Sequence, residues 1–396
     1  MPAPLAGLKV LELARILAGP WSGQLLADLG ATVVKVERAD GGDDTRTWGP
    51  PFVPEAGGGA SAAYFHATNR GKRSIAVDFD DPEGLAVVRA LAAGADVVIE
   101  NFKVGGLVKY GLDAATLRAA HPGLVYCSIT GFGQDGPYAA RAGYDFIIQG
   151  MGGVMDLTGE PDGEPQKIGV AFADIFTGVY ATTGILAALR ERDRTGRGAH
   201  VDMALLDTQV SVLANQAMNY LVSGRAPRRL GNAHPNIVPY QVFATADRPI
   251  ILATGNDAQY RRVCGILGLD GLVADPRFAT NRGRVENRAA LVPMLEAAFA
   301  ARASAELLDA LEAAGVPAGP VNSLAEVFAD PQVVARGMRL DLDRAGAGSV
   351  PTVRSPIVLD GAPAVADRAS PALDADGAAL RALIAQGRDP WDVGEA

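Results

Sequence analysis

Short β-rich runs alternate with helical segments over the first third of the chain, and this alternation constrains the fold more than any other feature. The β-rich runs are residues 8–13, 32–37, 74–78, 96–100 and 124–130, and the helical segments are residues 21–29, 82–93 and 114–120. Strands that alternate with helices predict a parallel sheet. We therefore expect an α/β fold with an open, doubly wound, Rossmann-like sheet, whose ligand lies beyond the carboxyl ends of the strands.

The chain of 396 residues is too long for one ordinary core. Residues 199–205 resemble a further strand and residues 207–221 a helix, after which residues 223–236 form a linker rich in Gly, Pro and Arg. A hairpin-like pair and several helices follow. We predict a large α/β domain over 1–225, an inserted smaller α+β domain over 226–330, and a return to the large domain over 331–396.

Composition argues against several classes of protein. The net charge of −9 is unfavourable for general nucleic-acid binding. Cys127 and Cys264 lie in apolar runs, which is typical of buried thiols, and the few Cys and His residues show no metal-ligand spacing. No apolar stretch reaches the roughly 20 residues of a membrane span, and the N-terminus lacks a signal-peptide pattern. We expect a cytoplasmic protein with no membrane, nucleic-acid or metal partner.

Asp174 is the strongest candidate for a catalytic residue. It precedes residues 175–189, an uncharged run rich in small side chains that predicts a closely packed helix. The positive end of the helix dipole favours an ionised acid at this position. Asp is also a preferred helix cap, so a structural role is the alternative. A carboxylate is already ionised near neutral pH, and it therefore acts as a nucleophile without a neighbouring base.

The loop after the first predicted strand is ARILAGP, residues 14–20, and lacks the Gly-x-Gly-x-x-Gly pattern of dinucleotide-binding folds. Glu37 ends the second strand, where such folds keep an acid that binds ribose, and Arg38 beside it is suited to a phosphate. A nicotinamide oxidoreductase is therefore a weak alternative.

Eight motifs in a fixed order resemble the family III CoA-transferases, also called the formyl-CoA transferase and carnitine CoA-transferase family. The motifs, with the Asp174 segment between the fifth and sixth, are LAGLKVLELARILAGP, ADLGATVVKVER, NRGKRSIAVDF, DVVIENF, ITGFGQDGPYAARAGYD, RTGRGAHVDMALLD, ATGND and VPAGPVN. The resemblance covers residues 5–336. It implies an open α/β domain that holds CoA, a small domain over the active site, and an interlocked homodimer.

The resemblance also implies roles for individual residues. Asp174 falls on the nucleophile of the transferases. The CoA-binding positions are Leu17, Ala18, Arg38, Val77, Asp78, Phe79, Asn101, Phe102, Lys109, Gly143, Tyr144 and Asp145. Gly255 and Asn256 fall on the glycine-containing turn that covers the acyl group. Coenzyme A and acyl-CoA are then substrates, and no tightly bound cofactor is expected.

Two departures from the family pattern bear on the reaction. Formyl-CoA transferases carry Gln where this chain has Leu17, which disfavours an oxalate or formate substrate. The α-methylacyl-CoA racemases of the same family carry His where this chain has Tyr144. A Tyr side chain, with a reference pKa of about 10, is a poor replacement for that base. An α-methylacyl-CoA racemase and a non-catalytic CoA-binding protein are the alternatives.

Residues 155–178 and 228–243 are most similar to the branch that moves CoA from succinyl-CoA to a dicarboxylate such as glutarate or 3-hydroxy-3-methylglutarate. A second carboxylate needs a cation in its site, because an unpaired buried charge is costly. The candidates are Arg46, Arg228 and Arg229. The expected reaction is acyl-CoA:carboxylate CoA transfer through a covalent aspartyl intermediate.

Overall fold

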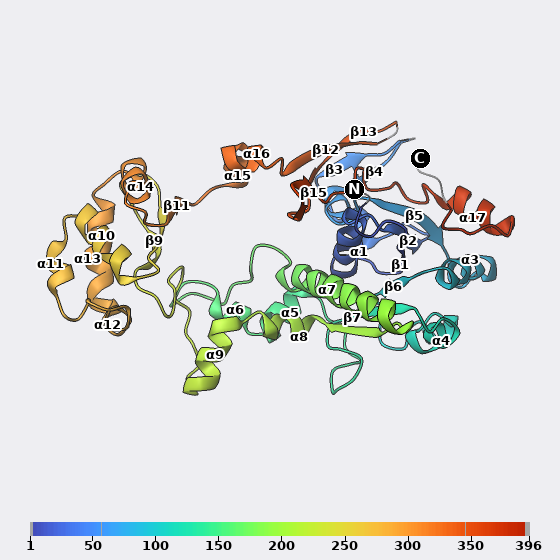
Figure 1. Cartoon of the computed structure of the whole chain (residues 1–396), viewed down its shortest axis with the longest axis horizontal. Helices are drawn as coiled ribbons and strands as arrows, with labels where there is room; N and C mark the ends of the chain where they lie inside the picture. Colours follow the sequence, from blue (N-terminus) through green and yellow to red (C-terminus); the bar gives the residue numbers. More distant parts are fainter. Residues whose placement is uncertain (1–2, 57, 345, 393–396) are drawn as a thin grey trace. The chain divides into compact units, whose positions relative to one another are not determined.

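The computed structural model describes residues 3–56, 58–344 and 346–392. The chain divides into two compact units, and it passes from one to the other four times (Figure 1). The first unit comprises Met1–Val154, Lys167–Met218 and Pro331–Ala396, and the second comprises Met155–Gln166 and Asn219–Asp330. Each unit has a hydrophobic core of its own, so each is described separately.

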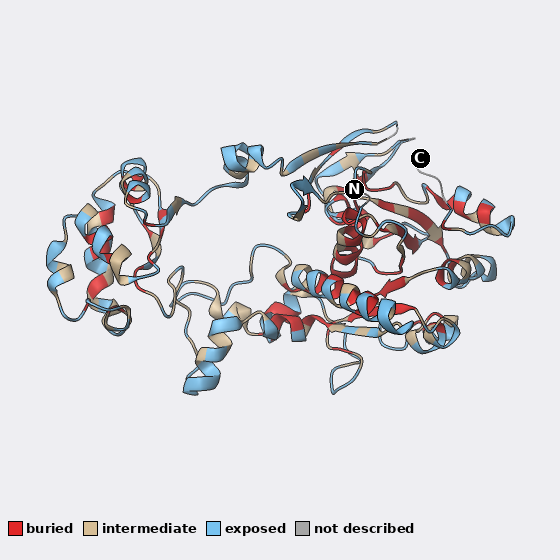
Figure 2. Ribbon diagram, viewed as in Figure 1, coloured by how far each residue is buried: buried red, intermediate tan, exposed pale blue. Residues whose placement is uncertain are grey.

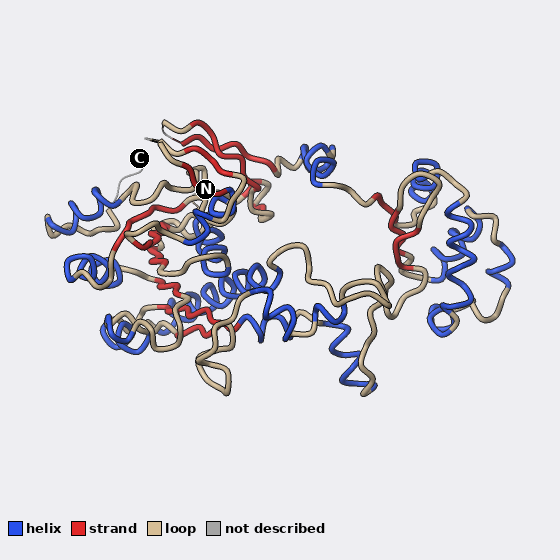
Figure 3. Tube along the Cα trace, turned by 180° about the vertical axis from the view of Figure 1, so that it is seen from behind, coloured by secondary structure: helices blue, strands red, loops and turns tan. Residues whose placement is uncertain are grey.

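A six-stranded, wholly parallel sheet forms the centre of the first unit (Figure 3). Its spatial order is β5-β2-β1-β6-β7-β8. The strands are β1 (Lys9–Glu12), β2 (Thr32–Arg38), β5 (Lys72–Val77), β6 (Val97–Glu100), β7 (Val125–Thr130) and β8 (His200–Ala204). The predicted parallel α/β sheet is confirmed. The direction of strand order reverses between β1 and β6, which is where open sheets of this kind form a ligand crevice.

Helices cover both faces of this sheet. Val10 and Val97 belong to the core beneath α1 and α7, whereas their neighbours Leu11 and Val98 pack with α3 and α4 on the opposite face. Because the central strands are buried on both faces, they occur in the sequence as mainly apolar runs, and in Figure 2 they are coloured as buried. The covering helices are α1 (Ala18–Asp28), α3 (Pro82–Ala93), α4 (Ala114–Ala120), α7 (Phe172–Thr195) and α17 (Gly377–Ala385).

Helix α7 packs closely along α1. A Cβ atom at Gly178 would lie 2.7 Å from the carbonyl oxygen of Ala18 and 2.9 Å from Cβ of Trp21, so only glycine permits this approach. Contrary to the expectation from sequence, α7 is long and apolar enough to cross a membrane by length and composition. In this fold its buried face packs against the core formed with α1 and the sheet. The packing places the first turns of α1 and α7 beside the same cavity.

The C-terminal segment returns to the first unit. The hairpin formed by β12 (Arg339–Arg344) and β13 (Gly348–Val353) lies beside that of β3 (Phe52–Pro54) and β4 (Ala60–Ala62), and Arg344 binds Glu55 at 2.8 Å (Figures 1 and 3).

The remaining elements of the first unit and of its boundaries with the second unit are η1 (Asp44–Thr47), α2 (Ala63–His66), η2 (Val108–Tyr110), α5 (Asp145–Met151), α6 (Val154–Leu157), α8 (Leu205–Ser211), α9 (Ala214–Ser223), α16 (Pro331–Ala335), β14 (Val358–Leu359) and β15 (Ala362–Pro363).

The second unit packs helices on a three-stranded antiparallel sheet of order β11-β10-β9. Its elements are β9 (Tyr240–Phe243), β10 (Ile250–Ala253), α10 (Asp257–Ile266), α11 (Asp270–Ala274), α12 (Asn281–Glu286), α13 (Arg288–Ala300), α14 (Ser304–Ala313), β11 (Ala318–Pro320) and α15 (Leu324–Ala329). Phe243 and Phe299 stack at its centre with ring centroids 4.5 Å apart. As expected, Cys127 and Cys264 are buried free thiols, one in each unit.

The boundaries of the units differ from the predicted ones. The prediction placed all of residues 1–225 in the large domain, whereas residues 155–166 and 219–225 pack with the second unit. Arg229 donates to the backbone oxygens of Asp156 and Gly163, and the amide of Gly231 donates to the carbonyl oxygen of Gly159. These contacts join residues about 70 positions apart, so no local pattern could predict them.

Candidate active site

A cavity of about 780 Å³ lies at the carboxyl ends of the strands in the first unit. Its wall includes Ala14 after β1, Ala39 after β2, Asp78 after β5, Asn101 after β6 and Gly131 after β7. The cavity therefore spans the reversal of strand order between β1 and β6. Its volume lies in the upper part of the range for small-molecule and cofactor sites, which runs from roughly 300 to 1,000 Å³.

Most of the residues predicted from sequence line this one cavity. They are Leu17, Ala18, Arg38, Val77, Asp78, Phe79, Asn101, Phe102, Gly143, Tyr144 and Asp174. They come from separate stretches of the chain. The parallel sheet gathers them because they lie at the ends of strands, in the loops that follow, or near the starts of helices. The rings of Phe79 and Phe102 stack with centroids 6.0 Å apart and give the wall a flat apolar element. Lys109 and Asp145 lie outside the lining.

Several basic side chains belong to the cavity lining, and sequence analysis identified only Arg38 among them. Arg15 and Arg38 both bind the carboxylate of Asp44, at 2.7 and 3.3 Å. Arg141 also lines the cavity, and its guanidinium lies 4.5 Å from the centre of the Tyr138 ring. Lys103 is a further lining residue that sequence analysis missed. Acidic side chains, among them Asp40 and Asp78, also line the cavity, so these cations suit an anionic group of a ligand locally and do not make the whole cavity basic.

Two of these residues were detectable in the sequence. Arg15 lies in the loop after the first predicted strand, and Lys103 follows Asn101 and Phe102 directly. Both therefore follow strand ends, where ligands of such sheets bind. Lys109 is different, because its ammonium group is exposed, lies 3.5 Å from Asp80 and stacks on Tyr110.

Asp174 lies in the first turn of α7 and lines the cavity. Burial of the carboxyl group, and then the negative charge of Asp145, raise the pKa of Asp174 to about 7. No cation among the described residues offsets this shift, because burial and Asp145 are its two causes. The group is thus a desolvated carboxylate with little stabilisation of its charge, and such a carboxylate is reactive toward an electrophilic carbonyl.

Asp145 supports the start of α7 and does not line the cavity. Its Oδ1 accepts hydrogen bonds from the amides of Ala173 and Asp174 at 2.8 and 3.3 Å, and its Oδ2 accepts one from Gln149 at 2.7 Å. The side chain of Asp145 therefore caps the helix that presents Asp174. Nothing in the sequence distinguishes this role from a ligand contact, because the two residues are far apart in the chain.

Tyr64 is a residue near Asp174 that sequence analysis missed. Burial raises the pKa of the Tyr64 hydroxyl, and the charges of Asp174 and Asp145 raise it further. Its ring meets that of Trp48 edge to face, with centroids 5.4 Å apart. Neither residue lies in a run that marks a site, so only the three-dimensional structure identifies them.

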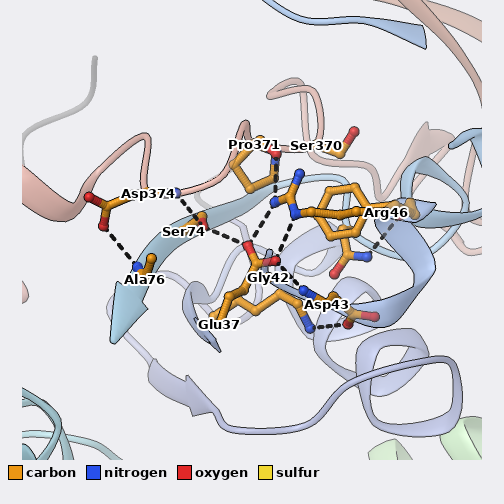
Figure 4. A network of polar contacts seen from close by, with 12 residues as sticks. Glu37, Gly42, Asp43, Arg46, Ser74, Ala76, Ser370, Pro371 and Asp374 are labelled. Atoms are coloured by element: carbon orange, nitrogen blue, oxygen red, sulfur yellow. Dashed lines mark hydrogen bonds and ion pairs between the residues drawn. The ribbon is translucent and has the colours of Figure 1, made fainter. Parts of the chain in front are cut away.

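Arg46, a candidate for a second substrate carboxylate, is buried and does not line the cavity, although its partner Glu37 does. Its guanidinium binds both oxygens of Glu37 at 2.7 Å, donates to the carbonyl oxygen of Pro371 and lies 3.6 Å from the centre of the Phe65 ring (Figure 4). Glu37 also accepts from Ser74 and from the amide of Asp43. With its oxygens engaged in this way, Glu37 is poorly placed to bind a ribose, which weakens the nicotinamide alternative.

The remaining predicted residues belong to the second unit. The side chain of Asn256 caps α10 by accepting from the amide of Gln259, and the amide of Gly255 donates to the Gln259 side chain. Arg229 is engaged by Asp156 and by backbone oxygens, whereas Arg228 is exposed. Arg228 therefore remains the freer of the two linker candidates.

Known proteins resemble this chain over most of its length. A succinate–glutarate CoA-transferase of Agrobacterium fabrum is 59% identical over 371 residues, which cover 93% of both chains. A succinyl-CoA:glutarate CoA-transferase of Mus musculus is 45% identical over 347 residues, covering 88% of this chain and 78% of the relative. The crystal structure of a CAIB/BAIF family protein from Brucella suis matches with a TM-score of 0.85 and 60% identity, covering 96% of this chain and 99% of the other.

The family model agrees with these relatives and with the geometry of the cavity. The model for CoA-transferase family III matches residues 5–377, which include every strand of the parallel sheet and all of the second unit. The match therefore extends over most of the chain and does not rest on local motifs alone. The chain belongs to CoA-transferase family III.

Proposed function

We propose that this enzyme transfers CoA from succinyl-CoA to a dicarboxylate such as glutarate, with Asp174 as the covalent nucleophile. The observation that supports Asp174 most directly is its position, because it is a desolvated carboxylate in the wall of a cavity that lies at the strand ends and is also lined by Arg38 and Arg141. The substrate class is supported by the relatives named as succinyl-CoA:glutarate CoA-transferases.

The first half of the reaction would remove the donor acid from CoA. An oxygen of Asp174 attacks the thioester carbonyl, the carbon–sulfur bond breaks, and a mixed anhydride and CoA thiolate form. The thiolate then attacks the aspartyl carbonyl, which releases the donor carboxylate and leaves an aspartyl-CoA thioester. Acylation removes the charge of the desolvated carboxylate, so the same desolvation that raises the pKa of Asp174 favours the acyl-enzyme.

The second half repeats these steps with the acceptor. The acceptor carboxylate attacks the aspartyl thioester, CoA thiolate leaves, and a new mixed anhydride forms. The thiolate attacks the acceptor carbonyl, which gives the new acyl-CoA and regenerates the Asp174 carboxylate. Backbone amides near Gly143 are suited to stabilise the oxyanion of each tetrahedral intermediate, an effect worth about 3 kcal/mol per donor. The family resemblance supports a substrate role for Gly255 and Asn256.

We also propose that the enzyme is an interlocked homodimer. The family resemblance supports this assembly, and so does a row of exposed apolar side chains on α7, namely Phe176, Val179 and Tyr180.

A donor and acceptor panel tests the proposed reaction. Succinyl-CoA and acetyl-CoA are offered against formate, oxalate, carnitine and dicarboxylates of four to six carbons, and the new CoA esters are identified by mass. We expect succinyl-CoA with glutarate to react fastest. Formate, oxalate or carnitine as the best acceptor would contradict the substrate but not CoA transfer.

A deuterium experiment separates this reaction from racemisation. Tyr144 stands where the racemases have a histidine base, so a 2-methylacyl-CoA incubated with the enzyme in D2O should gain no deuterium at its α-carbon. Enzyme-dependent exchange would instead favour the racemase.

A further inference from the structure

The loop that follows β1 contains a strained residue directly before the predicted CoA contacts Leu17 and Ala18. Ile16 has a φ of +73°, in the left-handed region that β-branched residues strongly disfavour. Such a conformation persists only where the surrounding structure holds it. Leu17 and Ala18 line the cavity, and no side chain caps the start of α1 at this point. The conformation of Ile16 therefore sets where the first turn of α1 faces the ligand.

Side chains from other strands and loops hold three successive residues of this loop. Lys35 donates to the carbonyl oxygen of Ala14 at 2.7 Å. Asn101 clamps Arg15 on both sides, because its amide accepts from the Arg15 nitrogen at 3.0 Å and donates to the Arg15 oxygen at 2.7 Å. Asn101 was predicted to contact the ligand, but both polar groups of its side chain bind the loop backbone.

Asp43 holds the strained residue itself. Both carboxylate oxygens of Asp43 accept from the amide of Ile16, at 3.2 and 3.1 Å, and the side chain is 2% exposed. The ammonium group of Lys35 lies 2.9 Å from Asp43 and 3.0 Å from Glu12, and it is fully buried. Thr45 donates to Asp43 through its amide at 3.0 Å and through its hydroxyl at 2.8 Å. Lys35 and Thr45 therefore fix the position of the Asp43 carboxylate, independently of its contact with Ile16.

This ion pair is kept charged. Burial opposes ionisation of Asp43, but the charge of Lys35 and the hydrogen bonds from Lys35 and Thr45 outweigh it and lower the pKa of Asp43 to about 2. The amide of Asp43 in turn donates to Glu37, the centre of the network in Figure 4. The strained loop is thus tied to the rigid interior of the sheet.

We propose that Asp43, fixed by Lys35 and Thr45, is a positioning residue for acyl-CoA: it holds Ile16 in the left-handed conformation and so places Leu17 and Ala18 for the ligand. This inference rests on the proposed CoA-transferase function. It assigns to Asp43 an effect on CoA affinity and not on the chemistry at Asp174, because Asp43 contacts the loop and not the reacting atoms.

The test compares Asp43→Asn with Asp28→Asn in the full-length enzyme. Asp28 is a similarly buried acid at the other end of α1, where it binds Arg70 at 2.6 Å. Unlike Asp43, it does not line the cavity, so the recovery with Ile16→Gly described below is what separates positioning from a direct ligand contact. Both substitutions should lower Tm. Asp43→Asn should raise Kd and KM for CoA thioesters about 10- to 100-fold, with kcat and the KM for the acceptor nearly unchanged. Asp28→Asn should leave KM for the thioester as in the wild type.

A second substitution tests whether the conformation of Ile16 is the cause. Glycine adopts positive φ without support, so Ile16→Gly added to Asp43→Asn should restore most of the lost CoA affinity. If Asp43→Asn does not fold, Thr45→Val replaces it, since this variant loses only one hydrogen bond to Asp43 and should raise KM for the thioester about two- to fivefold.

The possible outcomes distinguish the positioning role of Asp43 from the proposed CoA-transferase function. Equal KM values for Asp43→Asn and Asp28→Asn, or no recovery with Ile16→Gly, would overturn the positioning role while the wild type still transfers CoA. A wild-type enzyme that binds no CoA in a calorimetric titration would overturn the proposed function and this inference together.

Discussion

At the scale of single residues, Asp174 shows a conflict between stability and reactivity. Burial and the neighbouring Asp145 disfavour its charge, yet the proposed reaction needs the ionised form. Asp174→Asn keeps the shape of the side chain and removes the nucleophile. We expect transfer to fall by about three orders of magnitude or more while CoA still binds, because the amide is a poor nucleophile. Steady-state transfer assays and calorimetric CoA titrations measure both effects.

Chemical trapping provides the control for that substitution. Hydroxylamine or borohydride added to wild-type enzyme with acyl-CoA should modify Asp174, and mass spectrometry of the intact protein should detect the adduct. Full activity of Asp174→Asn, together with no adduct on rapidly quenched wild type, would exclude the covalent aspartyl route.

The same substitution should change stability in a pH-dependent way. The pKa of Asp174 is about 7 in the folded protein and about 3.9 in the unfolded chain. Below about pH 4 the group is protonated in both states, so it does not lower the free energy of unfolding. Between pH 4 and pH 7 ionisation lowers the free energy of unfolding increasingly, and above pH 7 the reduction is complete. Asp174→Asn should be more stable than wild type at pH 8, by on the order of a few kcal/mol, and not at pH 4. Denaturant titrations at the two pH values measure the difference.

The pH dependence of the reaction should report the same group. Only the carboxylate attacks, so kcat/KM for acyl-CoA should rise with pH through an apparent pKa of about 7. Asp145→Asn removes the like charge but keeps an oxygen to accept from Ala173, so it should move this rise to lower pH. A rise that stays in place in Asp145→Asn would show that Asp145 does not influence the ionisation of Asp174.

At the scale of elements, the sequence predicted the sheet well because of how it is buried. The strands of a parallel sheet are covered on both faces, so β1, β6 and β7 occur as short, mainly apolar runs, and β2 is mainly apolar apart from its charged side chains such as the buried Lys35. Residues just after those strands reach the cavity for the same topological reason. The position of a long polar side chain was not predictable in this way. Whether Arg46 meets a substrate or Glu37 depends on how η1 folds back on β2, and neither segment specifies that alone.

The contact between α1 and α7 is an element whose sequence requirement is testable. Gly178→Ala would place a methyl group 2.7 Å from the Ala18 carbonyl oxygen and force the two helices apart. We expect a loss of about 1–3 kcal/mol in the free energy of unfolding and weaker CoA binding, because the first turn of α1 moves with its axis. Gly265→Ala in α10 is the control, since no atom lies within 4 Å of its new methyl group. That variant should be neutral or slightly stabilised in a denaturant titration.

At the scale of the whole molecule, the chain leaves an apolar surface unburied. Helix α7 is covered by α1 and the sheet on one side, but Phe176, Val179 and Tyr180 on its other side are 36%, 41% and 43% exposed. Phe146 and Ile147 of α5 are also exposed, at 60% and 46%. Apolar side chains gathered on successive turns of a helix usually mark an interface. The uncharged sequence of α7 predicted a closely packed helix. Within one chain, only the side that faces α1 and the sheet is packed in this way.

We therefore expect a dimer whose interface covers this side of α7. Light scattering at micromolar concentration should give twice the chain mass of 41.0 kDa. Val179→Glu should abolish the dimer or prevent folding, because a charge would be buried without a partner. Val108→Glu, at a residue that is 60% exposed on η2, should leave the mass unchanged. If the chains interlock, differently tagged dimers mixed under native conditions should not exchange subunits until they are unfolded. A wild-type mass of one chain would contradict the assembly, and rapid exchange would indicate a dimer whose chains are not interlocked.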